Sequence, residues 1–239
     1  ASGINYGLIG AITAEESATL VIDSADVQSD GKIVIEPRTN YTIGRFEVPM
    51  INDISRVGLM VTDVSRKNNP GATVVGMDWN LGFLDNRLFT NGQIVRSDNN
   101  NITGNAVRFN LGYMDPFWWS ARFWYGHYDD EFDVNDLGYL RRNDMNWVGG
   151  RIEFRKQVPW GRFIYNDVEF KYMQEWRGDG LVLERELEIE QSNLFNNYWR
   201  AGFFSKVFLP AYNDEDVFRD EKAWAYKTEL WGYAGPIFS

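Results

Sequence analysis

Four glutamates at two-residue spacing are the best candidates for a pair of catalytic carboxylates: Glu184, Glu186, Glu188 and Glu190. On a β-strand such residues share one face, and a rise of ~3.3 Å per residue puts their Cβ atoms roughly 6–7 Å apart. That separation is compatible with the two carboxylates of a glycoside hydrolase. Four like charges in a row are more typical of a solvated face, for example an acidic ladder that lines a wet lumen. We therefore assign no catalytic residue and keep a paired-carboxylate enzyme as an alternative.

The densest group of oxygen donors follows His127, and a hard cation such as calcium prefers donors of this kind. The candidate calcium ligands are Asp129, Asp130, Glu131, Asp133 and Asp136. Their spacing does not match the EF-hand pattern, so a hydrated acidic loop is the competing interpretation. A second acidic run, between residues 214 and 221, is interpreted in the same way. We expect no other metal and no organic cofactor.

Several classes of chemistry are excluded by composition. The chain has no cysteine, which removes disulfides, thiolate nucleophiles and thiolate metal sites. It has a single histidine, His127, which excludes motifs that need two and is more typical of a structural role. With 24 basic against 34 acidic residues the net charge is −10, which argues against a nucleic-acid partner. Gly-x-Ser-x-Gly and phosphate-binding glycine motifs are absent from the sequence.

The elements that would position these residues are long alternating segments. Apolar and polar residues alternate in stretches of about 9–13 residues that are separated by Asn, Asp, Gly and Pro clusters, which is typical of β-strands. Residues 107–113 and 117–125 are clear examples. About a dozen such strands, with no linker between them, predict a single antiparallel domain over residues 1–239.

The connections predict hairpins that alternate between short and long. Short turns are expected at residues 85–86, 158–161 and 177–180, where turn-forming residues cluster. Longer polar loops are expected at residues 65–71, 98–104, 129–142 and 211–222. Such an alternation is typical of the two ends of a barrel.

Arginines fall mostly on the polar face, and with the glutamates they predict a cross-strand ion-pair network inside a lumen: Arg45, Arg108, Arg122, Arg151 and Arg155.

The same alternation occurs in soluble β-proteins and in membrane barrels. Several segments reach the ~9–11 residues of a membrane-spanning strand, whereas soluble strands usually have about 5–6. The chain contains 10 Trp, 12 Tyr and 16 Phe despite a mean hydropathy of −0.41. Many aromatic residues near segment ends resemble the girdles of a membrane barrel: Trp118, Trp119, Trp124, Tyr125, Trp147, Trp160, Tyr172 and Trp176. Exposed Trp and Tyr also suit sugar stacking, although core packing or lipid contact explains the embedded ones.

Four stretches follow one another in a distinctive order, at residues 39–46, 55–62, 76–81 and 138–144. Together they resemble an uncharacterised bacterial domain of unknown function, which follows a family-9-like carbohydrate-binding module in large secreted or envelope proteins. In that family the last stretch carries a Phe where this chain has Tyr139, and Asn143 precedes the aspartate here. The resemblance spans roughly residues 39–155 and becomes vaguer towards the end of the chain.

The resemblance implies an outer-membrane β-barrel, or part of a larger barrel, in a Gram-negative cell envelope. It carries over no catalytic residues. We therefore expect an all-β, antiparallel up-and-down barrel with a structural, pore or surface-display role. Such a role favours a protein that is not an enzyme. Its expected partners are the lipid bilayer, other strands or domains of the same envelope assembly, and glycans. The alternative is a carbohydrate-active β-protein, either a glycoside hydrolase or a carbohydrate-binding module.

Overall fold

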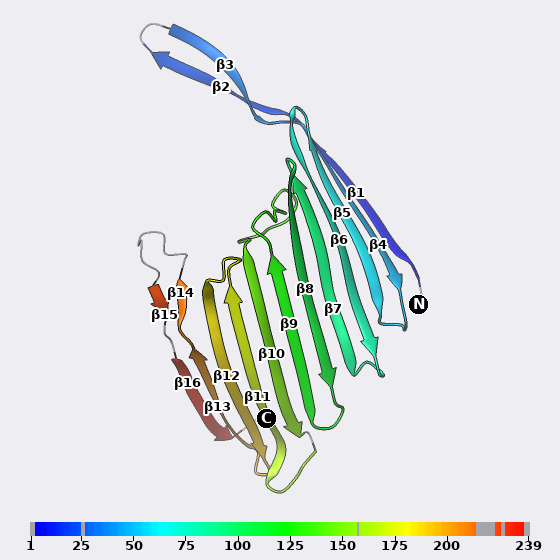
Figure 1. Cartoon of the computed structure of the whole chain (residues 1–239), viewed down its shortest axis with the longest axis vertical. Coiled ribbons are helices and arrows are strands. Elements are labelled where there is room, and N and C mark those ends of the chain that lie inside the picture. Colours follow the sequence, from blue (N-terminus) through cyan, green and yellow to red (C-terminus); the bar gives the residue numbers. More distant parts are fainter. Residues whose placement is uncertain (1–2, 25–26, 157, 214–222, 226–227, 237–239) are drawn as a thin grey trace.

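The computed structural model describes residues 3–24, 27–156, 158–213, 223–225 and 228–236, and this part of the chain folds into strands (Figure 1). None of the described residues forms a helix able to cross a membrane. The strands are β1 (Asn5–Thr13), β2 (Glu16–Ser24), β3 (Val27–Glu36), β4 (Thr39–Pro49), β5 (Arg56–Arg66), β6 (Asn69–Phe83), β7 (Leu88–Asn99), β8 (Ile102–Met114), β9 (Trp119–Tyr128), β10 (Met145–Lys156), β11 (Phe163–Trp176), β12 (Val182–Phe195), β13 (Trp199–Phe208), β14 (Ala211–Asn213), β15 (Ala223–Ala225) and β16 (Thr228–Pro236).

Twelve strands form one antiparallel sheet in which neighbours in sequence are mostly neighbours in space. Its order is β1-β4-β5-β6-β7-β8-β9-β10-β11-β12-β13-β16. The β2–β3 hairpin leaves this sheet and projects beyond one end of it, and β14 pairs only with β15 (Figure 1). The all-β, antiparallel prediction with about a dozen strands is confirmed. Within the described residues the sheet is open, because β1 and β16 form its two edges and do not pair with each other.

Two of the expected long loops are tight hairpins instead. β5 and β6 are joined at residues 67–68, and β7 and β8 at residues 100–101. Asn68, Asn100 and Asn101 have φ of 61°, 54° and 64°, the left-handed backbone that two-residue hairpin turns require and that Asn tolerates. The predictions of longer loops at 65–71 and 98–104 were therefore wrong, because polar residues there continue the strands. The longest connection within the continuously described chain is the segment between β9 and β10, residues 129–144.

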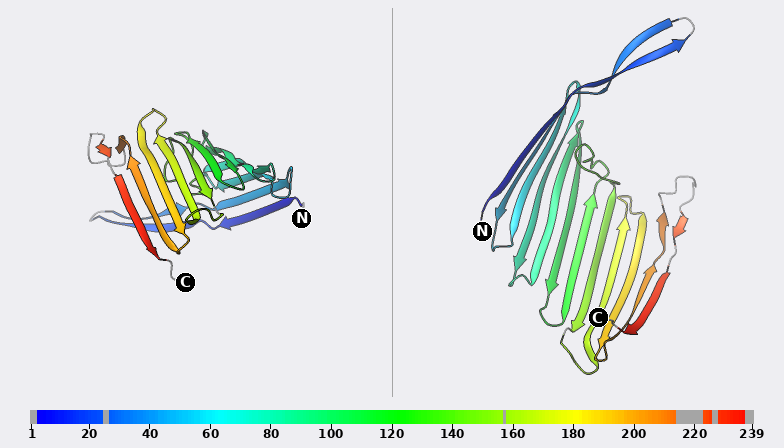
Figure 2. Two further views of the ribbon diagram at one scale, coloured as in Figure 1. Left: turned by 90° about the horizontal axis from the view of Figure 1, so that it is seen from below. Right: turned by 180° about the vertical axis from the view of Figure 1, so that it is seen from behind.

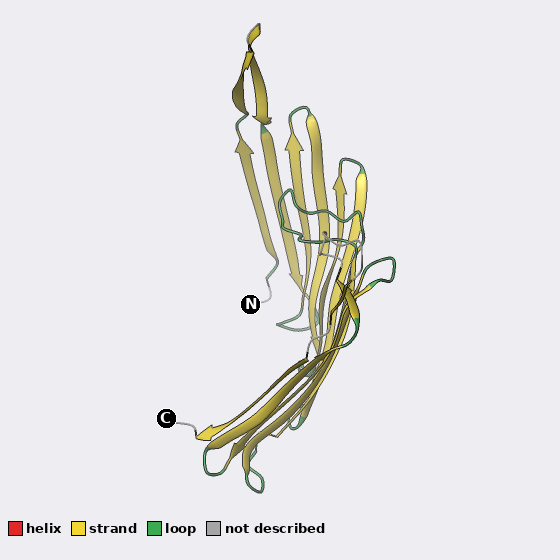
Figure 3. Ribbon diagram, turned by 90° about the vertical axis from the view of Figure 1, so that its left-hand side faces the viewer, coloured by secondary structure: helices red, strands yellow, loops and turns green. Residues whose placement is uncertain are grey.

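The sheet is curved, and its two faces carry different side chains. Figures 2 and 3 show the strands bending together into a trough, with the β9–β10 connection lying on the concave side. Ten strands each present at least one large apolar side chain on the opposite, convex face, and ten of these side chains, one from each strand, are exposed by 39–49%. They are Phe46, Leu59, Met77, Ile94, Leu111, Phe123, Ile152, Phe170, Leu187 and Phe203.

Few apolar side chains are buried for a sheet of this size. Among the described residues, the buried apolar side chains are Val64, Ala72, Ala106, Phe132 and Ala211. A sheet in water normally buries one apolar face against another layer, because burial of apolar surface is the main favourable term in folding. Here the apolar face stays uncovered in the single chain. The alternating pattern therefore specifies a sheet whose apolar face is not covered by any other described part of this chain.

Flat aromatic rings over glycines fix the register at four points of the sheet. The directly paired residues are Trp79 with Gly92, Phe89 with Gly112, Trp124 with Gly149, and Trp147 with Gly126. A Cβ on any of these glycines would collide with the ring opposite. The ring shields the bare backbone of the neighbouring strand, which is a recognised way of stabilising a glycine in a sheet.

This packing predicts a sharp difference between two adjacent glycines on β10. Gly149→Ala would press a methyl group into the Trp124 indole, whereas a Cβ on Gly150 lies at an ordinary 3.4 Å from the Arg122 carbonyl oxygen. We expect Gly149→Ala to lower the free energy of unfolding by about 1–3 kcal/mol, the usual penalty of overpacking. Gly150→Ala is expected to change it by less than about 0.5 kcal/mol.

Denaturant titration followed by tryptophan emission measures both variants. Adding Trp124→Leu to Gly149→Ala should recover part of the loss, since the smaller side chain gives the methyl group room. Equal effects of the two alanines would show that the ring–glycine contact does not constrain the sheet.

Candidate functional site

The acidic ladder of β12 lies on the concave face and is interleaved with lysines. Register pairing places Glu184, Glu186, Glu188 and Glu190 opposite β11 on one face, as predicted. The Glu186 side chain is only 1% exposed and is held between two ammonium groups, with Lys171 Nζ at 3.0 Å from Oε1 and Lys206 Nζ on Oε2. Lys171 also lies 3.5 Å from Glu188. The expectation of a solvated face is therefore wrong for Glu186, because lysines from both neighbouring strands cover it.

This arrangement disfavours paired-carboxylate catalysis at the ladder. A glycosidase needs two carboxylates that reach a substrate, one to protonate or attack and one to activate water. Glu186 is inaccessible and neutralised by two cations, which suits a structural ion-pair cluster. Sequence spacing could not reveal this, since Lys171 and Lys206 come from other strands and meet Glu186 only through the register.

Further ion pairs extend the network across the concave face. Arg45 donates to both carboxylate oxygens of Asp78, at 2.6 and 2.9 Å, and lies 3.3 Å from Glu47. Arg151 and Arg155 pair with Glu169 and Glu153 at 3.1 and 3.8 Å. The predicted cross-strand network is confirmed at Arg45 and Arg151, whereas Arg155 pairs with Glu153 of its own strand β10. Arg122 instead covers the Phe89 ring, with its guanidinium carbon 5.4 Å from the centroid.

The β9–β10 connection, residues 129–144, folds back over the concave face. Its backbone reaches β8 at Gly104, where a Cβ would collide with the main chain of Phe132. The Phe132 side chain is 4% exposed and stacks on Tyr128. The Asp133 amide donates to the buried hydroxyl of Ser97 at 3.1 Å. These contacts turn the segment into an ordered flap that covers part of the trough, visible on the concave side in Figure 3.

The five candidate calcium ligands lie in this flap, and three of them, Asp129, Asp133 and Asp136, are engaged by protein donors. Asn99 Nδ2 donates to Asp133 and Asp136 at 2.9 and 3.3 Å, and Arg66 pairs with Asp136. The backbone N–H of Asn105 donates to Asp129 at 2.6 Å. Within the described residues, no group of three or more carboxylate or histidine side chains is arranged to hold a metal ion. Asp129, Asp133 and Asp136 act in the structure as anchors to β5, β7 and β8.

Asp133 gives this anchoring a pH dependence. The backbone N–H of Asn135, helped by the side-chain amides of Asn99 and Asn135, holds the Asp133 pKa below its usual range. Because the folded pKa lies below the unfolded one, this carboxylate stabilises the flap above the ordinary Asp pKa of about 4, and the stabilisation is lost as pH falls through the lower folded value. We expect backbone amides of residues 129–144 to exchange faster at pH 3 than at pH 6, after correction for intrinsic rates.

Two variants test the assignment of that effect to Asp133. Asp133→Asn at pH 6 should loosen the flap as acid does, while exposed Asp130→Asn serves as the control and should leave its exchange unchanged. Hydrogen exchange read by mass spectrometry on peptides from the flap gives the answer. If Asp130→Asn and Asp133→Asn behave alike, net charge and not the Asn99 and Asn135 contacts holds the flap.

A cavity of about 420 Å³ lies between the flap and the strands beneath it. Its floor is the Arg45–Asp78 pair, and Thr62 and Gln93 add further polar groups. The flap contributes Val134, Leu137 and Tyr139. Sequence reasoning treated the flap as a hydrated acidic loop and missed this cavity. The apolar residues of the flap, which lie between the anchoring aspartates in the sequence, were the signal that the flap packs against the sheet.

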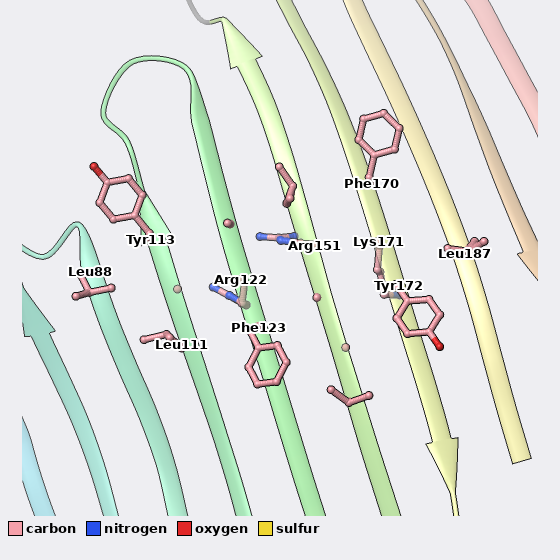
Figure 4. Close-up of a pocket in the computed structure, with 16 residues that line it drawn as sticks. Leu88, Leu111, Tyr113, Arg122, Phe123, Arg151, Phe170, Lys171, Tyr172 and Leu187 are labelled. Atoms are coloured by element: carbon pink, nitrogen blue, oxygen red, sulfur yellow. The ribbon is translucent and has the colours of Figure 1, made fainter. Parts of the chain in front are cut away.

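A second hollow of about 650 Å³ lies on the convex face across β8–β12 (Figure 4). Ala121 and Gly150 leave space between bulkier neighbours, so that Leu111 and Phe123 stand on one side and Phe170 and Tyr172 on the other. Its exposed surface is almost wholly apolar, and Arg122, Arg151 and Lys171 also border it. It is a depression in the exposed apolar face and contains no arrangement of reactive groups.

The remaining predicted residues are placed as follows. His127 Nδ1 lies 2.7 Å from Asn146 Oδ1 near the flap end of the convex face, in keeping with a structural role. Trp124 and Trp147 lie on the concave face, so their assignment to an outward aromatic girdle was wrong. Trp118 stacks on Phe154 with ring centroids 5.9 Å apart, at the end of the sheet opposite the flap. The second acidic run, residues 214–221, lies outside the described residues.

Comparison with known proteins gives one family assignment. No curated protein and no solved structure matches the chain. A family model described as a domain of unknown function (DUF5916) matches residues 1–229, nearly the whole sequence. The resemblance seen in four short stretches is thereby confirmed, while the placement of the domain after a carbohydrate-binding module stays a prediction. The chain belongs to the DUF5916 domain family.

Proposed function

We propose that this chain forms the wall of an outer-membrane β-barrel in a Gram-negative envelope. The convex face lies against lipid, the concave face borders a water-filled interior, and the flap of residues 129–144 narrows that interior. The observation that carries the proposal is the row of large, half-exposed apolar side chains, at least one on each of ten successive strands. Contiguous exposed apolar surface on that scale is typical of a surface that meets lipid or another protein.

Strand length and charge distribution support the same assignment. The strands of the main sheet have 9–15 residues, and a tilted strand needs ~9–11 to cross the hydrocarbon layer. The ion pairs of Arg45, Arg151 and Lys171 all lie on the concave face, as expected when charged residues face water inside a barrel. A two-layer soluble protein would need a second layer over the convex face.

A closed barrel requires pairing partners for the two open edges of the sheet. β1 and β16 each present one unpaired edge in the described sheet, and all nine residues of β1 are exposed. An exposed strand edge is a template for pairing, and within a bilayer it is not tolerated. We propose that these edges pair with each other in the membrane or with strands of the same envelope assembly.

Fractionation tests this proposal. The chain, expressed with its natural flanks in a Gram-negative host, is expected in the outer-membrane fraction and should resist carbonate and urea extraction. Its band on a gel is expected to shift only after boiling, as for a folded barrel. A chain that is soluble and monomeric without detergent would contradict the proposal, since the convex face would then tolerate water.

A further inference from the structure

Two tryptophans form a flat platform on the concave face. The sequence Trp124-Tyr125-Gly126 on β9 pairs with Trp147-Val148-Gly149 on β10, so that each tryptophan faces the other strand's glycine. The close approach of each indole to the opposite glycine means that the rings lie flat against the sheet. A ring lying flat on one side presents its other face to the trough. Both indoles are partly exposed there.

The platform is part of a pocket of about 430 Å³, a size within the range of small-ligand sites. Trp124, Trp147 and Tyr128 supply the aromatic surface, and Tyr128 meets the Trp147 ring edge-on with centroids 4.9 Å apart. The walls come from both sides of the platform. β11 contributes Met173 and Glu175, and the end of the flap contributes Leu140, Arg141 and Arg142.

This combination selects a class of ligand. A sugar ring has an apolar face of C–H groups that packs on an indole, and a rim of hydroxyls that both donate and accept hydrogen bonds. The pocket offers two adjacent indole faces, guanidinium donors and a carboxylate acceptor. A purely apolar ligand would bury the charged groups at the rim against a surface that offers them no hydrogen bonds, and an isolated anion would lie against Glu175 and the aromatic faces.

Another ring on the concave face, that of Phe89, has different surroundings from the two indoles. Phe89 also lies flat over a glycine, Gly112, but the Arg122 guanidinium covers the ring. Within the described residues, no cation covers the Trp124 or Trp147 ring in this way. Both indoles stay partly exposed beneath the pocket, and Tyr128 packs edge-on against the Trp147 ring.

We propose that the pocket over Trp124 and Trp147 binds an oligosaccharide. One or two sugar rings stack on the indoles, and their hydroxyl groups bond to Arg141, Arg142 and Glu175. The inference goes beyond the proposed membrane location and does not rest on it, because side chains on the concave face of the sheet and from the flap build the whole pocket. Solubility of the chain would contradict the barrel and leave this binding site testable.

The test uses the full chain, in detergent if it requires one, and a panel of hexasaccharides: maltohexaose, cellohexaose, xylohexaose, laminarihexaose and chitohexaose. Saturation-transfer NMR and tryptophan emission are recorded up to 10 mM sugar. We expect at least one sugar to bind saturably, with transfer strongest at ring C–H protons. Absence of binding by every member of the panel would overturn the proposal.

Variants then locate the site. Trp124→Leu and Trp147→Leu keep an apolar cover over the glycine but remove the stacking surface, and each is expected to weaken binding at least about tenfold. Glu175→Gln should weaken it less. Phe89→Leu is the matched control, since it removes a glycine-covering ring outside the pocket and should leave affinity unchanged.

Folding of each variant is checked by circular dichroism and by the heat-dependent gel shift. If a tryptophan variant fails to fold, Glu175→Gln and Arg141→Gln decide the question. Folded variants of these pocket residues that all bind the sugar as tightly as the parent chain would overturn the proposal. So would a loss of affinity in Phe89→Leu equal to that in the pocket variants.

Discussion

Ile94→Arg is expected to lower the free energy of unfolding by about 2–4 kcal/mol in a bilayer, the penalty for arginine at the lipid-facing middle of a barrel strand. Ile94 lies centrally on β7, is 49% exposed, and points to the convex face. The neighbouring residue Gln93 is the matched control. It points to the concave face between Asp78 and Arg108 of the adjacent strands, so an arginine there has both an acidic and a basic neighbour.

Urea titration of both variants in phosphatidylcholine vesicles, followed by tryptophan emission, gives the two free energies. Gln93→Arg is expected to change stability by less than about 1 kcal/mol, since it replaces one long polar side chain by another in a wet interior. In water, arginine at a half-exposed surface position usually changes stability by only about 0.5 kcal/mol. Equal, small effects at the two positions would therefore show that the convex face does not meet lipid.

The strands and their faces were predictable because alternation is a local property. Residues 107–113 and 117–125 carry their own face assignment, and the observed register places Phe109 and Tyr125 directly opposite each other on the apolar side. The tight hairpins were missed for a related reason. Polar residues near 65–71 and 98–104 resemble loops in composition, while only backbone conformation shows that Asn68, Asn100 and Asn101 turn the chain within two residues.

The concave site was less predictable because its contacts join distant parts of the chain. The flap was identified as acidic, but its partners Arg66, Ser97 and Asn99 lie 30 or more residues earlier. The tryptophan platform needs the register of β9 against β10, which no spacing within one strand reveals. Two Trp-x-Gly sequences on adjacent strands were the available signal. Their meaning depends on an antiparallel pairing that places each ring over the opposite glycine.

Glu186→Gln is expected to destabilise the sheet by about 3 kcal/mol, towards the lower end for breaking a buried ion pair. The Glu186 carboxylate is 1% exposed and neutralises Lys171 and Lys206, whose side chains are 26% and 21% exposed. A glutamine leaves both cations with less compensation in a poorly solvated place. Partial exposure of the lysines limits the loss, since water can still reach them. Guanidinium titration of the folded chain measures the change.

Glu184→Gln on the same ladder is the matched control, and it is expected to be neutral or stabilising. Glu184 lies directly opposite Glu175, so removing its charge relieves a cross-strand repulsion. Combining Glu186→Gln with Lys206→Gln should recover part of the loss, because one unpaired cation disappears. If Glu184→Gln and Glu186→Gln have equal effects, the four glutamates form a uniform solvated face and the lysines contribute little. A large difference would instead identify Glu186 as the residue through which β12 is joined to both of its neighbours, because Lys171 belongs to β11 and Lys206 to β13.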